Sequence, residues 1–440
     1  MHKLKNRHLR MIALGGVIGT GLFFGSAKTI QMTGPSIILA YILSGLVVYI
    51  IMRALGEMTV ANPNSGSFSE YANKYIGKYA GFISGWSAWF EYTVVCMVEL
   101  TAVTIFIDYF YPGIPHWIIC FVILVIFTGI NLLSIRLFGE FEFWFAGIKV
   151  CAIIAMLIFS AYLIFFKHSL NPQIGEYANS SILFAGGLKG FIASLVIVVF
   201  SFGGTEFVTI AAGESEDPNQ TVPKAINGTI FRILIFYILT MTAIIALYPF
   251  TQLSNNISPF VDVFKKIGLT YAAGVMNLVA ITAALSAFNS CLYSASRMVF
   301  SLGCNGHAPK GLSKISPKRH IPQKAVIFTS SSVLIAVLVN YLFPNKAIMY
   351  LLTIATSTIL IVWFMVLVTQ IYFRKHMIVN KKELKYRLYL YPFANIIAII
   401  YLIIVMFIML DMDDLRMSVY VAPLWILGLS MIYAIKRKPH

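Results

Sequence analysis

The sequence predicts an all-α polytopic membrane protein, and its composition is the first reason. Of the 440 residues, 59% are hydrophobic and only 11% are charged, whereas a soluble globular chain carries roughly a quarter charged residues. The mean hydropathy is +0.82. Apolar runs of the roughly 20 residues that a bilayer-spanning helix needs recur along the whole chain, which predicts about twelve spans.

Each expected span is one of these apolar runs, and basic or polar residues separate it from the next. The first run has basic flanks but no small-residue cleavage pattern, so we interpret it as a span and not as a signal peptide. In chain order the runs are 10–29, 34–58, 80–111, 115–134, 142–166, 187–211, 225–249, 269–301, 324–343, 347–373, 389–410 and 417–435.

The basic residues predict the orientation, because cytoplasmic loops collect Lys and Arg. Four of them lie before or at the start of the first span, four lie between the eighth and ninth spans, six lie between the tenth and eleventh, and three follow the last span. We therefore expect both termini in the cytoplasm. The net charge of +16 follows from this topology, so no nucleic-acid partner is expected.

Two of the expected spans are rich in glycine, which costs a helix interior roughly 0.5–1 kcal/mol relative to alanine. Residues 13–27 read ALGGVIGTGLFFGSA, and the sixth span contains FGGTEF. The first and sixth spans differ by an odd number of crossings, so the second copy enters the membrane from the opposite side. Paired broken helices in inverted repeats mark the binding site of secondary transporters. Close packing of helices through small residues is the alternative.

A helix broken at mid-membrane frees backbone groups that protein, water or a ligand must satisfy, because lipid cannot. The N-terminus of a half-helix suits a carboxylate. The C-terminus of a half-helix offers carbonyl groups to an ammonium group or another cation. An α-amino acid carries a carboxylate and an ammonium group on one carbon, so the pattern favours an amino acid as the ligand.

Five stretches carry a more specific signature: GGVIGTGLFFGSA, GPSIILAYILSGLVVYIIMRALGEM, FGEFEFWFAGIKV, GTEFVTIAAGESEDPNQTVPKAI and SRMVFSLGCNGHAPK. The chain resembles the amino acid permeases of the amino acid–polyamine–organocation superfamily, in particular the bacterial amino acid transporter branch. The resemblance implies a single transporter domain with a first inverted repeat at 10–166, a second at 187–373, and two additional helices at 389–435. It also implies proton-driven uptake of an amino acid by alternating access across a bacterial plasma membrane.

The resemblance assigns residues to the binding of the substrate. The unwound stretch of the first span, which holds the substrate carboxylate in the family, corresponds to Ile18, Gly19, Thr20 and Gly21. In the sixth span, Phe200 matches the aromatic residue that closes over the substrate in related transporters. Gly203 and Gly204 match the point where this span unwinds.

Charged residues deep inside spans are costly, so each is a hypothesis about function. Glu91 and Glu99 both lie in the third span, and their offset of about two helical turns places them on one face. A buried ion-pair network that holds the helices together is the alternative. Glu57 and Glu142 lie near expected span ends, so we expect them to reach the membrane interface.

Proton coupling is expected at Lys149, Glu99 and Glu206. In sodium-coupled relatives of this fold a sodium ion fills the cleft between helices 1, 5 and 8, and in proton-coupled relatives a lysine of helix 5 projects its ammonium group there. Lys149 matches that lysine, and burial disfavours the charged form of a lysine, so it can release a proton. Glu206 matches an acid proposed to sense pH in related exchangers, or it pairs with a cationic substrate.

Other functions find less support in the sequence. Neither C-x-x-C nor H-E-x-x-H spacing is present, so we expect no metal site and no cofactor. The chain lacks G-x-S-x-G and nucleotide-loop motifs of enzymes and a repeated pore loop of channels. Sodium-coupled symport, exchange, and an amino acid sensor without net transport stay open. The pattern looks nearest to proline- or histidine-type permeases, so a neutral amino acid such as proline, or histidine, is the favoured substrate.

Overall fold

The computed structural model describes residues 16–62, 68–133, 135–167, 171–177, 179–207, 217–254, 257–317, 319, 321–344, 346–381 and 383–437. Within these ranges every regular element is a helix, and ten helical ranges are long and apolar enough to cross a membrane. The predicted fold class, an all-α polytopic membrane protein, is confirmed. Residues 10–15, 134 and 208–211 of the expected spans lie outside the described residues.

The ten ranges account for the expected spans once two details are considered. The first range, Gly21–Ala61, contains residues 21–29 of the first expected span and the whole of the second. The sixth expected span corresponds to α9, Gly187–Ser201, which has 15 residues and is therefore too short to count as a full crossing. The span that the glycine pattern predicts to be broken is thus cut short in the structure.

The helices of the expected spans are, in order, η1 (Gly21–Gly25) with α2 (Ser26–Thr33), α3 (Ile37–Ala61), α5 (Lys78–Asp108), α6 (His116–Leu133), α7 (Ile135–Phe166), α9 (Gly187–Ser201), α11 (Pro218–Leu247), α13 (Thr270–Cys304), α14 (Gln323–Leu342), α15 (Ala347–Val379), α16 (Phe393–Asp411) and α17 (Asp413–Arg437). Short helices lie in the connections: η2 (Gly34–Ser36), α4 (Phe68–Tyr75), η3 (Ile174–Glu176), α8 (Ser180–Leu183), η4 (Phe250–Gln252), α12 (Pro259–Lys266) and η5 (Lys310–Ser313).

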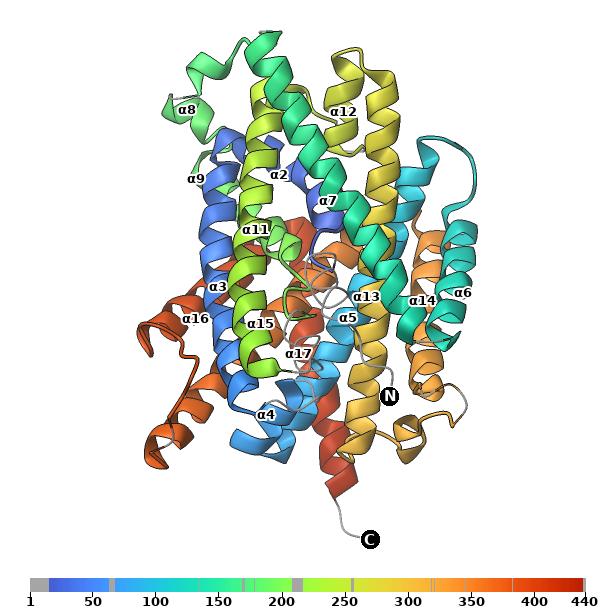
Figure 1. Ribbon diagram of the computed structural model, residues 1–440, viewed down its shortest axis with the longest axis vertical. Coiled ribbons are helices and arrows are strands. Elements are labelled where there is room, and N and C mark those ends of the chain that lie inside the picture. The colour runs from blue at the N-terminus through green and yellow to red at the C-terminus, as the bar shows by residue number, and fades with distance from the viewer. Residues whose placement is uncertain are drawn as a thin grey trace.

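The connections fall at two opposite ends of the bundle. Figure 1 shows α4 and the end of α17 at the lower end, and α8 and α12 at the upper end. Successive long helices therefore run up and down between these ends, as spans that cross a membrane must.

The centre of the bundle is formed by α5, α13 and α15, whose apolar windows are mostly buried inside the protein. The windows of α6, α7 and α17 are mostly exposed, with large side chains such as Trp144, Phe165 and Phe166 on the outside. Apolar side chains on the outer surface of a bundle are what a lipid environment requires. Only one face of α7 turns inward, and that face carries the charged residues of the site.

A sharp turn separates the first two spans. Helix α2 ends at Thr33, and the capping residue Gly34 has a φ of +65°, a left-handed conformation that glycine adopts without steric cost. Pro35 follows directly and begins the new direction in η2. A side chain at Gly34 would also meet the carbonyl oxygen of Ile182 at 2.8 Å, so both the conformation and the space favour glycine.

Candidate substrate and coupling site

The first unwound segment, residues 16–19, precedes the π-helical turn η1 and contains Ile18 and Gly19. Thr20 closes this segment and is fully buried. Its backbone N–H donates to both carboxylate oxygens of Glu99, at 3.1 and 3.2 Å, and its hydroxyl donates to the same carboxylate. Glu99 lies on α5, so the third span supplies an anion to the start of the half-helix η1–α2. A buried carboxylate is tolerated when such donors satisfy it.

Lys149 reaches the same segment from α7. Its ammonium group donates to the carbonyl oxygen of Ile18 at 2.9 Å, and the side chain is fully buried. It also interacts electrostatically with Glu142 on its own helix and with Glu99 on α5. The structure therefore brings Lys149, Glu99, Ile18 and Thr20 together, with a cation on the carbonyl side of the segment and an anion on the amide side.

Tyr237 of α11 is a third partner that the sequence analysis missed. Its hydroxyl lies 3.2 Å from the carbonyl oxygen of Val17 and 2.7 Å from the carbonyl oxygen of Ser201, the last residue of α9. One hydroxyl proton is thus shared between carbonyl groups of the two interrupted spans. The only signal in the sequence is a hydroxyl-bearing aromatic residue in an otherwise apolar run.

The second unwound segment, residues 202–206, follows the last residue of α9. Gly203 donates its N–H to the carbonyl oxygen of Phe200 at 2.9 Å, so the helix tightens before it ends. Gly204 has a φ of +87°, and a Cβ atom built on it would lie 2.9 Å from the carbonyl oxygen of Gly16. The two unwound segments therefore touch each other at Gly204 and Gly16.

The glycines of the first span permit close approach to other helices. A Cβ atom on Gly19 would lie 2.5 Å from a carboxylate oxygen of Glu99, and one on Gly21 would lie 2.5 Å from the Cα atom of Ser201. Gly19 thus lies against the acid, and Gly21 lies against the backbone of α9. Close helix packing, the alternative explanation of these glycines, therefore occurs beside the unwound segment.

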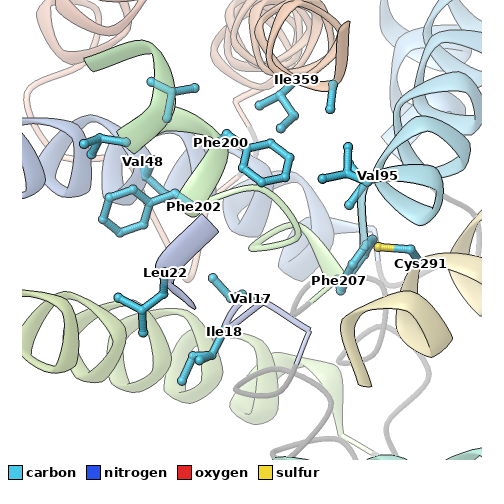
Figure 2. Close-up of a cluster of buried hydrophobic side chains, with 14 of the residues drawn as sticks. Val17, Ile18, Leu22, Val48, Val95, Phe200, Phe202, Phe207, Cys291 and Ile359 are labelled. Atoms are coloured by element: carbon cyan, nitrogen blue, oxygen red, sulfur yellow. The ribbon is translucent and has the colours of Figure 1, made fainter. Parts of the chain in front are cut away.

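Phe200 is buried, with 4% of its surface exposed. Figure 2 shows it in a cluster of buried apolar side chains around the two unwound segments, together with Val95 of α5 and Ile359 of α15. Phe207, which follows the second unwound segment, and Cys291 of α13 belong to the same cluster. The backbone polar groups of the unwound segments are therefore bordered by an apolar wall with aromatic rings.

Comparison with known proteins agrees with this geometry. The amino acid permease family model matches residues 8–440. The chain belongs to the amino acid permease family. Unwound backbone lined by charged side chains in the first and sixth expected spans is consistent with this membership.

Curated relatives resemble this permease over almost its whole length. It is 43% identical over 437 residues to the aromatic amino acid transport protein AroP of Escherichia coli O6:H1, covering 99% of this chain and 95% of the relative. Its identity to AroP of Escherichia coli K12 is 42% over the same length and coverage. The uncharacterized transporter YdgF of Bacillus subtilis is 39% identical over 440 residues, with 99% and 96% of the two chains covered. These relatives include aromatic-type transporters, which corrects the expected likeness to proline- or histidine-type permeases.

Glu206 lies at the end of the second unwound segment of the permease and is buried. Its carboxylate accepts from the N–H of Gly204 at 3.3 Å and from the indole N–H of Trp363 at 3.4 Å. Glu91 of α5, also buried, interacts electrostatically with it. The shared face of α5 thus directs Glu99 to the first unwound segment and Glu91 to the residue that ends the second.

Glu142 does not reach the membrane interface, and that expectation is wrong. Its side chain is fully buried on α7, where it accepts a 2.6 Å hydrogen bond from the hydroxyl of Ser286 on α13. Asn289 of α13 accepts from the amide of Asn131 on α6 at 3.1 Å. Ser286, Ser290 and Asn289 of α13 all lie beside the buried Glu142 carboxyl group. Glu142 is also, with Glu99, an electrostatic partner of Lys149.

Glu57 lies about one turn before the end of α3, near a span end as expected, but its side chain is fully buried by protein contacts. It forms an ion pair with Arg374 of α15, with 2.6 Å between Oε1 and Nε. It also accepts from the N–H of Leu388 at 2.6 Å and from the amide of Gln370 at 3.2 Å. Glu57 therefore joins α3 to the end of α15 and to the connection that follows α15, although both lie more than 300 residues later in the sequence.

Proposed function

We propose that this permease takes up an aromatic amino acid across a bacterial plasma membrane by proton symport with alternating access. The observation that carries the proposal is the contact between the two unwound segments, at Gly204 and Gly16. Backbone donors and acceptors from two spans meet there in a buried place, and an amino acid needs both kinds of group.

The substrate carboxylate is assigned to the backbone donors of Ile18, Gly19, Thr20 and Gly21. The substrate ammonium group is assigned to carbonyl groups of the second unwound segment, near Gly203 and Gly204. Both assignments rest on the polarity of the half-helix ends. The contact of Thr20 with the carboxylate of Glu99 supports the first, because it shows an anion accepted at this helix end.

An aromatic side chain is the best match for the apolar wall. Phe200 and Phe207 lie in one buried cluster with Val95 and Ile359. Aromatic rings pack favourably on one another in offset or edge-to-face arrangements, worth about 0.5–1.5 kcal/mol beyond the buried area. The AroP proteins that the chain resembles carry aromatic amino acid transport in their names, which supports the same class of substrate over proline or histidine.

The coupling ion is assigned to the proton, with Lys149, Glu99 and Glu206 as the groups concerned. An ammonium group at the carbonyl oxygen of Ile18 supplies the positive charge that a sodium ion would otherwise supply. Sodium-coupled symport and amino acid exchange are the alternative modes of transport. A sensor that binds an amino acid without moving it is the alternative outside transport.

The proposed topology places both termini in the cytoplasm. It divides the chain into inverted repeats at 10–166 and 187–373 and two further helices at 389–435. The placement of α4 and the end of α17 at one end of the bundle supports this topology. An alkaline phosphatase fused to the C-terminus would be inactive if the terminus is cytoplasmic, and an active fusion would contradict the proposal.

Uptake into proteoliposomes tests the function directly. Purified permease is reconstituted, an inward proton gradient is imposed, and accumulation of radiolabelled phenylalanine, tyrosine and tryptophan is followed with and without sodium. We expect accumulation that needs the gradient but not sodium, and competition by aromatic amino acids over proline and histidine. Accumulation that occurs only with sodium would favour sodium-coupled symport. Specific binding without any uptake would favour the sensor.

A further inference from the structure

A cleft of about 330 Å³ lies at the end of the bundle that holds α4 and the end of α17 (Figure 1). Residues of α4, of the start of α5, of the connection that follows α13 and of the end of α17 line it. None of these residues belongs to the candidate substrate site. The cleft is therefore a separate feature, formed where three distant parts of the chain meet.

The charge of the cleft is positive. Lys78 of α5 and Lys436 of α17 both line it, and none of the lining residues that the structure describes is an acid. The ammonium group of Lys436 donates to the carbonyl oxygen of Gly306 at 3.0 Å, which holds it beside the connection after α13. An ammonium group has three protons to donate, so Lys436 keeps two of them for a ligand.

His307 lies in the field of both lysines. Burial lowers the pKa of its imidazole, and the charges of Lys436 and Lys78 lower this pKa further. The ring packs on Phe82, with 5.9 Å between the ring centroids. Its Nε2 atom is buried and meets no hydrogen-bond partner within the part of the chain that the structure describes. A bound anion would favour the protonated ring and offer it an acceptor.

The start of α5 adds backbone donors to the same place. The helix begins at Lys78, and its N-cap residue, Gly77, has no side chain that can accept from the N–H groups of the first turn. A Cβ atom built on Gly77 would have no described atom within 4 Å, so the space beside this helix end is open. Free N–H groups and the positive end of the helix dipole both favour an anion.

We propose that this cleft binds an anionic phosphate group, which joins the start of α5 to the connection after α13 and to the end of α17. A phosphate group offers several strong acceptor oxygens around one negative centre, so it can meet ammonium groups that approach from different helices. The group comes from a phospholipid headgroup or from a phosphate-bearing molecule in solution. In the proposed topology the cleft faces the cytoplasm, the side on which anionic lipids and basic pockets between helices meet.

Thermal unfolding of the purified permease tests the proposal and separates the two sources. A ligand that binds only the folded protein raises the melting temperature, and a titration gives its apparent Kd. One arm adds phosphatidylglycerol or, for comparison, zwitterionic phosphatidylcholine to the detergent micelles. The other arm replaces chloride by inorganic phosphate at constant ionic strength. A rise with phosphatidylglycerol alone would identify a lipid headgroup as the ligand, and a rise with inorganic phosphate would show that phosphate from solution reaches the cleft.

The double variant Lys78→Gln, Lys436→Gln removes both ammonium groups. Each lysine near a membrane surface contributes about a fivefold factor to the binding of an anionic lipid, so the apparent Kd should rise by about 25-fold. Lys436→Arg keeps the charge and should retain binding. The matched control is Lys314→Gln, Lys375→Gln, which removes the same total charge from exposed lysines that do not line the cleft. It should leave the apparent Kd nearly unchanged.

Two outcomes would overturn the proposal. One is a wild type whose melting temperature responds neither to phosphatidylglycerol over phosphatidylcholine nor to inorganic phosphate. The other is an equal loss of binding in the two double variants, which would show that anions respond to the overall charge and not to the cleft. Tryptophan binding should be intact in every variant and confirms that each is folded. A wild type that binds no aromatic amino acid would contradict the proposed function and leave the phosphate site unaffected.

Discussion

The ammonium group of Lys149 donates a 2.9 Å hydrogen bond to the carbonyl oxygen of Ile18. This bond joins the inward face of α7 to the first unwound segment. Lys149 is therefore fixed to the backbone that the substrate is assigned to, and it interacts with acids on both sides, Glu99 and Glu142. Substitutions of Lys149 can therefore test whether its positive charge or its ability to release a proton is needed.

Lys149→Met keeps the apolar stem and removes the charge. We expect concentrative uptake to be lost at every external pH, with or without sodium, because Ile18 loses its donor and Glu99 loses its cation. Lys149→Arg keeps a permanent charge and is the matched control. Retained accumulation in Lys149→Arg would support proton binding at Glu99, whereas its loss with intact binding would show that Lys149 must release a proton.

Tyr237→Phe removes the hydroxyl that serves the carbonyl oxygens of Val17 and Ser201. An unsatisfied buried carbonyl group costs about 1–3 kcal/mol, so we expect a lower melting temperature and weaker substrate binding. Tyr41→Phe is the control, because the Tyr41 hydroxyl lies 3.4 Å from the Ser201 hydroxyl, a weaker contact. Equal effects of the two substitutions would show that Tyr237 acts only through its ring.

Gly21→Ala tests how closely the first span must approach α9. The added Cβ atom would lie 2.5 Å from the Cα atom of Ser201, so the backbone must shift and binding should weaken. Gly147→Ala is the control, since nothing lies within 4 Å of a Cβ atom there and alanine stabilises a helix by about 0.5–1 kcal/mol over glycine. Thermal unfolding and substrate affinity measure both effects. Unchanged affinity in Gly21→Ala would show that this contact is adaptable.

The parts of the fold that depend on local composition could be predicted from the sequence. Apolar runs gave the spans, and glycine clusters gave both unwound segments, because hydropathy and helix propensity are local properties. Partners across the bundle could not be predicted in this way. Thr20 and Glu99 are 79 positions apart, and no local pattern states that they meet.

The burial of charged residues near span ends could not be predicted from the sequence either. A hydropathy window locates the end of a span but does not show what packs there, so the sequence predicts that Glu57 and Glu142 reach the interface. In the structure, Ser286 donates to one carboxylate oxygen of Glu142, and Arg374 forms an ion pair with Glu57. Since those partners lie on other helices, the burial is a consequence of tertiary packing.

Glu57→Gln tests the buried ion pair at the end of α3. The pair has 2.6 Å between charged atoms, with 12% of the Arg374 side chain and none of the Glu57 side chain exposed. Removing one partner of a buried pair typically costs about 3–5 kcal/mol, because the remaining charge stays uncompensated. We expect a much lower melting temperature and reduced uptake.

An exposed pair and a double substitution complete this test. Asp413→Asn breaks the pair with Arg416, in which the Asp413 side chain is 91% exposed, and such pairs contribute about 0–1 kcal/mol. It should therefore leave the melting temperature nearly unchanged. Glu57→Gln combined with Arg374→Gln should recover part of the loss, because the double variant has no unpaired charge to bury. A double variant that is as unstable as the sum of the single variants would show that Glu57 and Arg374 act independently, through the N–H of Leu388 and the other contacts of the connection.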